Sequence, residues 1–141
     1  MTDKVSEIKE ICKTESNLAY FDSVFPDFPD LTPREIKQIK YFAKSKLKEI
    51  IDLLKTFKDA PEDEINSGII SIWIELRSEW IRYNAVNNYN MVINGVASSL
   101  SVLKSGFVSY LIGKIETYIS EDKLEKLNDI MTKVQYNQLD D

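Results

Sequence analysis

The sequence contains no histidine, one cysteine, four glycines and four prolines in 141 residues. Without histidine there is no imidazole to serve as proton shuttle or metal ligand, and no serine–histidine or cysteine–histidine nucleophile pair. The single cysteine, Cys12, can form neither an intramolecular disulfide nor a four-ligand structural zinc site. The four scattered glycines make no phosphate-binding loop or dinucleotide fingerprint. We therefore expect no metal, no cofactor and no catalytic residue, and hence a protein that is not an enzyme.

The length and composition are those of one ordered domain. Hydrophobic residues make up 43% of the chain and charged residues 29%, which allows a core to form and argues against general disorder. Because glycine and proline are scarce, long regular elements are favoured over long loops. We expect a single helical-bundle domain over residues 1–141, with about 135–141 as a frayed polar tail.

Apolar residues recur every three or four positions from residue 32 to residue 134, which is the period of helices with one buried face. The clearest helix start is at Thr32, which is followed by Pro33 and then Glu35. Threonine at the N-cap and glutamate three residues later form a capping box, and proline is tolerated in the first turn. This helix is predicted to end near Lys58.

The other helices follow from the same pattern. A short N-terminal helix is predicted from Thr2 or Asp3, with a second short helical stretch at 17–24 and a proline-containing connector at 25–31. Asp59 is expected to cap the next main helix. Residues 69–76 are rich in β-branched and aromatic residues, which suits a strand, but the helical period over about twenty residues favours a helix.

Two more main helices complete the predicted fold. A turn is expected between Asn87 and Gly95, because Asn-Gly is a common left-handed helix stop. The next helix should run to about Ile119, and Ser120 should cap the last one. The predicted fold class is all-α: an antiparallel bundle of four main helices plus a short N-terminal helix.

Composition also bears on location and origin. Residues 91–113 contain one charge, Lys104, but their asparagine and serines favour a buried helix over a membrane span. The first residues lack a signal-peptide pattern, so we expect a cytoplasmic protein. The lysine-rich, arginine-poor, isoleucine-rich composition resembles that of many small proteins of hyperthermophilic archaea and their viruses. No motif carries this resemblance, so no functional residue follows from it.

The strongest charge pattern lies in the helix that begins after Thr32. From Arg34 to Lys58 there are eight basic and three acidic residues, a local charge of +5 that leaves −10 for the rest of the chain. At about 100° per residue most of these cations share one side of the helix, away from its apolar stripe. Such a face suits phosphates, an anionic membrane surface or an acidic protein patch. The predicted partner-binding face comprises Arg34, Lys37, Lys40, Tyr41, Lys44, Lys48 and Lys55.

Glu75 and Glu79 are the one carboxylate pair at helical spacing that has neighbouring tryptophans. Two such carboxylates can support acid–base or Mg²⁺ chemistry. The favoured interpretation is a solvated edge on which Glu79 pairs with Arg82, because nothing else supplies a nucleophile or a second set of ligands.

These observations favour a non-enzymatic interaction module or regulator that docks on a larger macromolecular machine, with a protein as the expected partner. One alternative is a nucleic-acid-binding accessory protein that uses the lysines of the basic face. Another is a self-associating structural protein of a virus particle, which would make the chain a homo-oligomer. A carboxylate-based hydrolase is the least favoured alternative.

Overall fold

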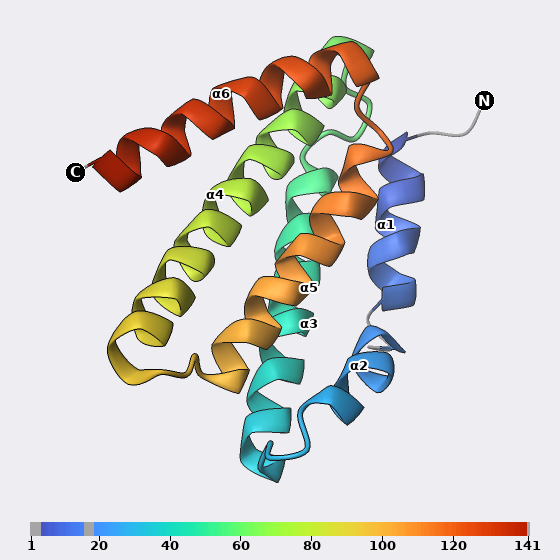
Figure 1. Ribbon diagram of the computed structural model, residues 1–141. Coiled ribbons are helices and arrows are strands. Elements are labelled where there is room, and N and C mark those ends of the chain that lie inside the picture. The colour runs from blue at the N-terminus through green and yellow to red at the C-terminus, as the bar shows by residue number, and fades with distance from the viewer. Residues whose placement is uncertain (1–3, 16–18, 141) are drawn as a thin grey trace.

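The computed structural model describes residues 4–15 and 19–140, and the side chains of 14, 15 and 134–140 are not described. The chain is all-α, as predicted, and no strand occurs in these two ranges. The elements are α1 (Lys4–Glu15), α2 (Ala19–Val24), the 3₁₀ turn η1 (Phe25–Asp27), α3 (Pro33–Lys55), α4 (Glu62–Asn94), α5 (Ser99–Glu116) and α6 (Glu121–Asp140) (Figure 1).

The helices pack around a core shared by α3, α4 and α5. Helices α4 and α5 run antiparallel and make the most extensive contact, and α3 packs against both α1 and α5. Helix α6 crosses one end of the other helices, and the chain ends beyond them (Figure 1). The start of α3, the end of α4 and the start of α5 all lie at the opposite end of the molecule.

The core is filled by large apolar side chains from these helices. An aromatic cluster joins α2 to α5, because the Phe21 and Phe107 rings stack with centroids 5.3 Å apart and Tyr20 stacks on Tyr110 at 4.7 Å. This cluster anchors the N-terminal segment on the main bundle. The most deeply buried large side chains are Trp73, Phe21, Phe107, Ile8, Ile39, Leu47, Leu54, Ile69 and Val108.

The predicted start of α3 is confirmed. The Glu35 backbone N–H donates to Thr32 Oγ1 at 3.2 Å, and the Thr32 backbone N–H donates to Glu35 Oε1 at 3.1 Å. These two bonds are the reciprocal capping box, and they set the rotation of the first turns of α3.

The boundary between α3 and α4 differs from the prediction. Helix α3 ends at Lys55 rather than near Lys58, and a tight turn follows. Asp59 does not cap α4, because it lies inside this turn with a left-handed φ of 61°. Pro61 holds the N-cap position and makes no side-chain capping bond. A left-handed residue reverses the chain here, and that conformation is incompatible with the extended backbone of an N-cap.

Helix α4 continues through the asparagine-rich segment to Asn94. Gly95 then takes a left-handed φ of 74°, and its N–H donates to the Met91 carbonyl at 3.0 Å. The predicted stop at Asn94-Gly95 is therefore confirmed. Helix α5 ends at Glu116, three residues before the predicted Ile119, and α6 extends into the segment expected to be a frayed tail. The predicted N-cap at Thr2 or Asp3 lies outside the described residues.

Candidate functional site

A basic groove lies between the first half of α3 and the start of α5. It encloses about 670 Å³ and is open to solvent. It lies at the end of the molecule opposite α6, where α3 and α5 begin (Figure 1). We call it the α3–α5 groove; it is lined by Arg34, Lys37, Gln38, Tyr41, Phe42, Ser45, Leu100 and Lys104.

Helical spacing positions the side chains of this groove. On α3, Arg34, Lys37, Tyr41 and Ser45 recur at intervals of three and four, so they share one side of the helix. On α5 the two lining residues are also four apart. The α3–α5 groove is therefore made from two helix faces and needs no loop to hold it open.

Phe42 and Leu100 supply the apolar part of the groove, and both pack partly against the core. The Phe42 ring is held by its neighbours, because the Tyr83 ring meets it edge-on at 6.1 Å. The Lys104 ammonium lies 5.3 Å from the centroid of the same ring. This cation–π contact places one positive charge of the groove beside its apolar floor. Tyr41, by contrast, is 75% exposed and presents its ring to solvent.

The groove carries positive charge without compensating acids. Its three cations come from Arg34, Lys37 and Lys104, and no aspartate or glutamate lines it. In the described part of the chain, no ion pair connects any of these three to a carboxylate. An apolar floor lined with unpaired cations attracts a ligand that is both apolar and acidic.

The structure divides the predicted partner-binding face. All seven of its residues are exposed, but only Arg34, Lys37 and Tyr41 line the groove. Lys40 points to the other flank of α3, where its ammonium lies 5.9 Å from the Phe25 ring centroid. Lys55 pairs with Asp52 at 3.8 Å. The last two residues, Lys44 and Lys48, are exposed and lie outside the groove lining.

Sequence reasoning missed Lys104, Phe42 and Leu100 as groove residues. Lys104 did stand out as the one charge in residues 91–113, which is a usable signal, because a cation in an otherwise apolar helix needs an exit to solvent. The position of α5 beside α3 was needed to place all three together.

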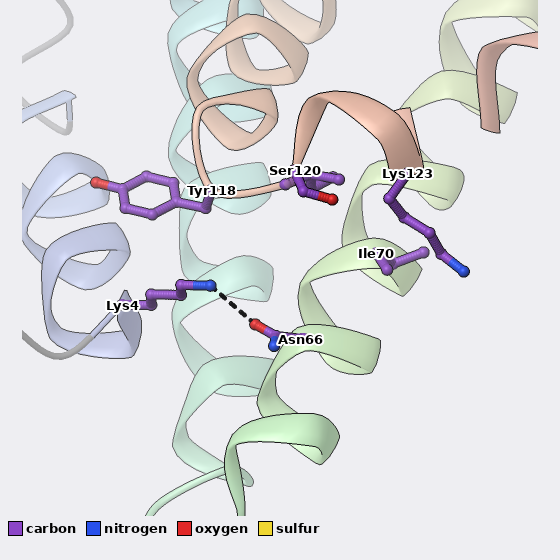
Figure 2. A pocket seen from close by; sticks show the side chains of 7 residues that line it. Lys4, Asn66, Ile70, Tyr118, Ser120 and Lys123 are labelled. Carbon is purple, nitrogen blue, oxygen red and sulfur yellow. Dashed lines mark hydrogen bonds between the residues drawn. The ribbon is translucent and has the colours of Figure 1, made fainter. Parts of the chain in front are cut away.

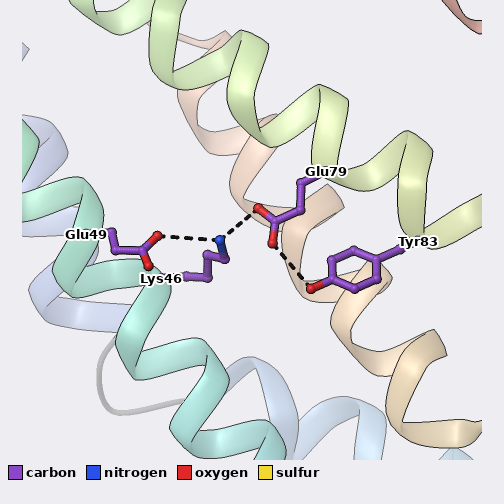
Figure 3. A network of polar contacts seen from close by, with 4 residues as sticks. All are labelled: Lys46, Glu49, Glu79 and Tyr83. Carbon is purple, nitrogen blue, oxygen red and sulfur yellow. Dashed lines mark hydrogen bonds and ion pairs between the residues drawn. The ribbon is translucent and has the colours of Figure 1, made fainter.

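The carboxylate pair on α4 has a structural role (Figure 3). The Glu79 carboxylate lies 2.9 Å from the Lys46 ammonium of α3, so the predicted pairing of Glu79 with Arg82 is wrong. The long Lys46 side chain reaches Glu79 from α3, while Arg82, on the same helix as Glu79, is exposed. Glu75 is exposed. Among the described residues, no group of three or more carboxylates or thiols could hold a metal ion.

The same polar network includes Tyr83 and Glu49. The Tyr83 hydroxyl donates to Glu79 at 3.3 Å, and Glu49 approaches the Lys46 ammonium at 3.4 Å. Burial by itself lowers the pKa of Lys46. The hydrogen bond and charge of Glu79 raise it, and the net result is a pKa above its usual value. Burial and the Glu79 charge raise the pKa of Tyr83. The network connects α3 to α4 through these polar contacts.

A smaller pocket of about 280 Å³ lies where α1, α4 and the start of α6 meet (Figure 2). The Lys4 ammonium donates to Asn66 Oδ1 at 3.0 Å, so this cation is already bonded. Figure 2 shows the Lys123 side chain pointing away from Lys4 and Asn66. Because its two cations do not converge, this pocket is a weaker candidate than the α3–α5 groove.

Comparisons with known proteins give no indication of function, so the α3–α5 groove is the main guide to it. No protein-family model, curated protein or solved structure matches the chain. Within the described residues, no helix has the length and apolar content needed to cross a membrane.

Proposed function

We propose that this chain is a non-enzymatic interaction module that docks on a larger protein assembly through the α3–α5 groove. Its ligand would be a segment of a partner protein that carries apolar and acidic side chains together. The observation that carries this proposal is the grouping of three unpaired cations around Phe42 and Leu100. Apolar anchors fill such a groove while its charged edge selects an acidic partner.

The exposed ring of Tyr41 supports a protein ligand. Tyrosine is enriched where proteins bind one another, because a rigid ring buries much area at little entropic cost. Tyr41 is 75% exposed beside the groove, so a docked segment can cover it. The division of the basic face disfavours a nucleic-acid function, since Lys40 and Lys55 are already engaged elsewhere and do not extend the groove into a continuous phosphate track.

A selection from a library of short random peptides displayed on phage tests this function. We expect the wild-type protein to enrich peptides that combine aspartate or glutamate with large apolar residues. The triple variant Arg34→Glu, Lys37→Glu and Lys104→Glu should lose these peptides. Its matched control is Lys44→Glu, Lys48→Glu and Lys55→Glu, which makes the same change of charge at exposed positions outside the groove. The control should bind as the wild type does.

Two results would reject the proposal. One is enrichment of peptides without acidic residues, and the other is equal loss of binding in both triple variants. A gel-shift titration with DNA and RNA at low salt addresses the alternative function. Binding of nucleic acid that disappears only in the groove variant would move the function to that class.

A further inference from the structure

A second exposed surface lies on the last three turns of α4 and the turn that follows them, and none of its residues lines the α3–α5 groove. Besides Met91 (52% exposed), five apolar residues there are more than half exposed, although large apolar side chains are usually covered. We call them the outer stripe; they are Val86 (51% exposed), Tyr89 (64%), Val92 (81%), Ile93 (60%) and Val96 (66%).

The outer stripe lies on the side of α4 that faces away from the bundle. The inner side is marked by Asn84, which accepts a hydrogen bond from Ser105 of α5 at 2.9 Å, and by Tyr83, whose ring meets Phe42 of α3. At about 100° per residue, Tyr89 projects roughly opposite these inner residues. In Figure 1 this part of α4 forms the outer edge of the molecule, with α5 on its inner side.

The spacing of the outer stripe fits a helical partner. Within α4, Val86, Tyr89 and Ile93 are separated by three and four residues, which is the spacing of a coiled-coil seam, and Val96 lies just beyond the helix end at Gly95. Side chains at these positions pack as knobs into holes of a facing helix. A seam of about two turns is short, so the facing surface must match it closely.

A second copy of the same helix supplies that match. Two identical helices packed antiparallel about a two-fold axis near Tyr89 place Val86 of each copy against Ile93 of the other. In such a contact only residues near the axis meet their own copies, so a charge near the axis would repel its copy on the other chain. The sequence has no charged residue from position 83 to position 103, so this source of repulsion is missing.

The exposed area also approaches what a dimer needs. A large apolar side chain contributes on the order of 100 Å² of apolar surface. The five exposed side chains of the outer stripe therefore offer about 300–400 Å² per copy. One side of a standard interface buries roughly 800 Å², a little over half of it apolar. The outer stripe supplies most of that apolar part.

From these observations we propose that the chain forms a two-fold symmetric homodimer through antiparallel packing of the outer stripes of two α4 helices. The dimer uses none of the groove residues, so it leaves two α3–α5 grooves free, one per copy. The proposal of a dimer does not depend on the function proposed for the groove.

Sedimentation velocity over a range of protein concentrations tests the dimer. The wild type should change from monomer to dimer as its concentration rises. Ile93→Glu should weaken the dimer by more than about tenfold, because two glutamates would be buried without partners. Ile130→Glu is the matched control, since this α6 residue is 57% exposed and lies outside the outer stripe. Helical circular dichroism should stay unchanged in both variants.

A charge-exchange experiment tests the antiparallel register. Val86→Glu with Ile93→Glu in one chain, and Val86→Lys with Ile93→Lys in another, should each be monomeric alone. Mixed together, they should form a one-to-one dimer, because each glutamate then faces a lysine.

Three outcomes would overturn the proposal. The wild type could stay monomeric at every concentration, or its dimer could survive Ile93→Glu. The protein could instead stay monomeric and co-sediment with vesicles of phosphatidylcholine and phosphatidylserine in a manner abolished by Ile93→Glu. That last result would assign the outer stripe to lipid.

Discussion

The ammonium of Lys46 on α3 lies 2.9 Å from the carboxylate of Glu79 on α4, and both side chains are largely shielded from solvent, at 20% and 14% exposure. Removing Glu79 leaves the shielded Lys46 ammonium with only Glu49, an exposed carboxylate 3.4 Å away, as an ion-pair partner among the described residues. We therefore expect Glu79→Ala to lower the free energy of unfolding by roughly 2 kcal/mol, between the values typical of exposed and fully buried pairs. Urea denaturation followed by circular dichroism measures this change.

Two further variants show whether pairing is the cause. Glu49→Ala removes the other carboxylate near Lys46, which is 68% exposed and 3.4 Å away, and should cost less than about 0.5 kcal/mol. Replacing both partners, with Lys46→Met and Glu79→Leu, should recover most of the lost stability because no charge remains unpaired. A double variant less stable than Glu79→Ala would show that packing, and not charge, explains the loss.

Stability should fall at alkaline pH through the same network. The pKa of Tyr83 is raised above its usual 10.0 by burial and by the Glu79 charge, so the folded protein favours the neutral phenol. The contribution of the neutral Tyr83 phenol to folding stability is therefore complete below pH 10.0, and it is lost as the pH rises through the folded-state pKa. The pKa of Lys46 is also raised, above 10.5, and acts in the same direction.

The expected result is a decline in melting temperature above about pH 10 that is shallower in Tyr83→Phe, because phenylalanine does not titrate. Tyr41→Phe, at a side chain that is 75% exposed and outside this network, is the control and should follow the wild type. Equal pH slopes in Tyr83→Phe and the wild type would remove Tyr83 from the explanation.

Gly95 and Gly113 should respond to alanine in opposite directions. A Cβ added at either position meets no atom within 4 Å, so crowding plays no part. Gly95 has a φ of 74°, which strains any residue with a side chain, and Gly95→Ala should cost about 1 kcal/mol. Gly113 lies in an exposed part of α5, where alanine is the better helix former, so Gly113→Ala should add up to about 1 kcal/mol. Thermal denaturation of the two variants shows whether each substitution raises or lowers the stability.

The helices could be predicted from the sequence because their signals are local. Thr32 and Glu35 form the capping box from four consecutive residues, and Gly95 ends α4 where the Asn-Gly pair indicated. Asp59 shows the limit of such reasoning. An aspartate two residues before a proline suits an N-cap, but Asp59 takes a left-handed φ of 61° in the tight turn between α3 and α4, and its local sequence did not indicate this.

The candidate site could be predicted only in part, because its two halves come from helices distant in sequence. Arg34, Lys37 and Tyr41 followed from the spacing along one helix. Their partner Lys104 is more than sixty residues away, and its place beside Phe42 depends on how α5 packs on α3. For the same reason the sequence predicts a pairing of Glu79 with Arg82, its neighbour on the same helix, whereas its ion-pair partner Lys46 lies on another helix.

The contact between Phe57 and Gly68 gives the sharpest test of how α3 and α4 are joined. The Phe57 ring packs over the buried Gly68 so closely that a Cβ there would overlap three ring atoms. Alanine gains about 1 kcal/mol in helix propensity, but overpacking costs about 1–3 kcal/mol. Because the ring is partly buried and cannot swing away freely, Gly68→Ala should be destabilising by roughly 1 kcal/mol.

The sign of this effect should reverse when the ring is removed. In a Phe57→Ala background there is room for the new methyl group, so Gly68→Ala should stabilise the protein through helix propensity alone. The difference between the two backgrounds is the coupling free energy of a double-mutant cycle, and we expect about 1–2 kcal/mol from urea denaturation. A Gly68→Ala variant that is stabilised equally in both backgrounds would mean that Phe57 does not pack on α4 at this point.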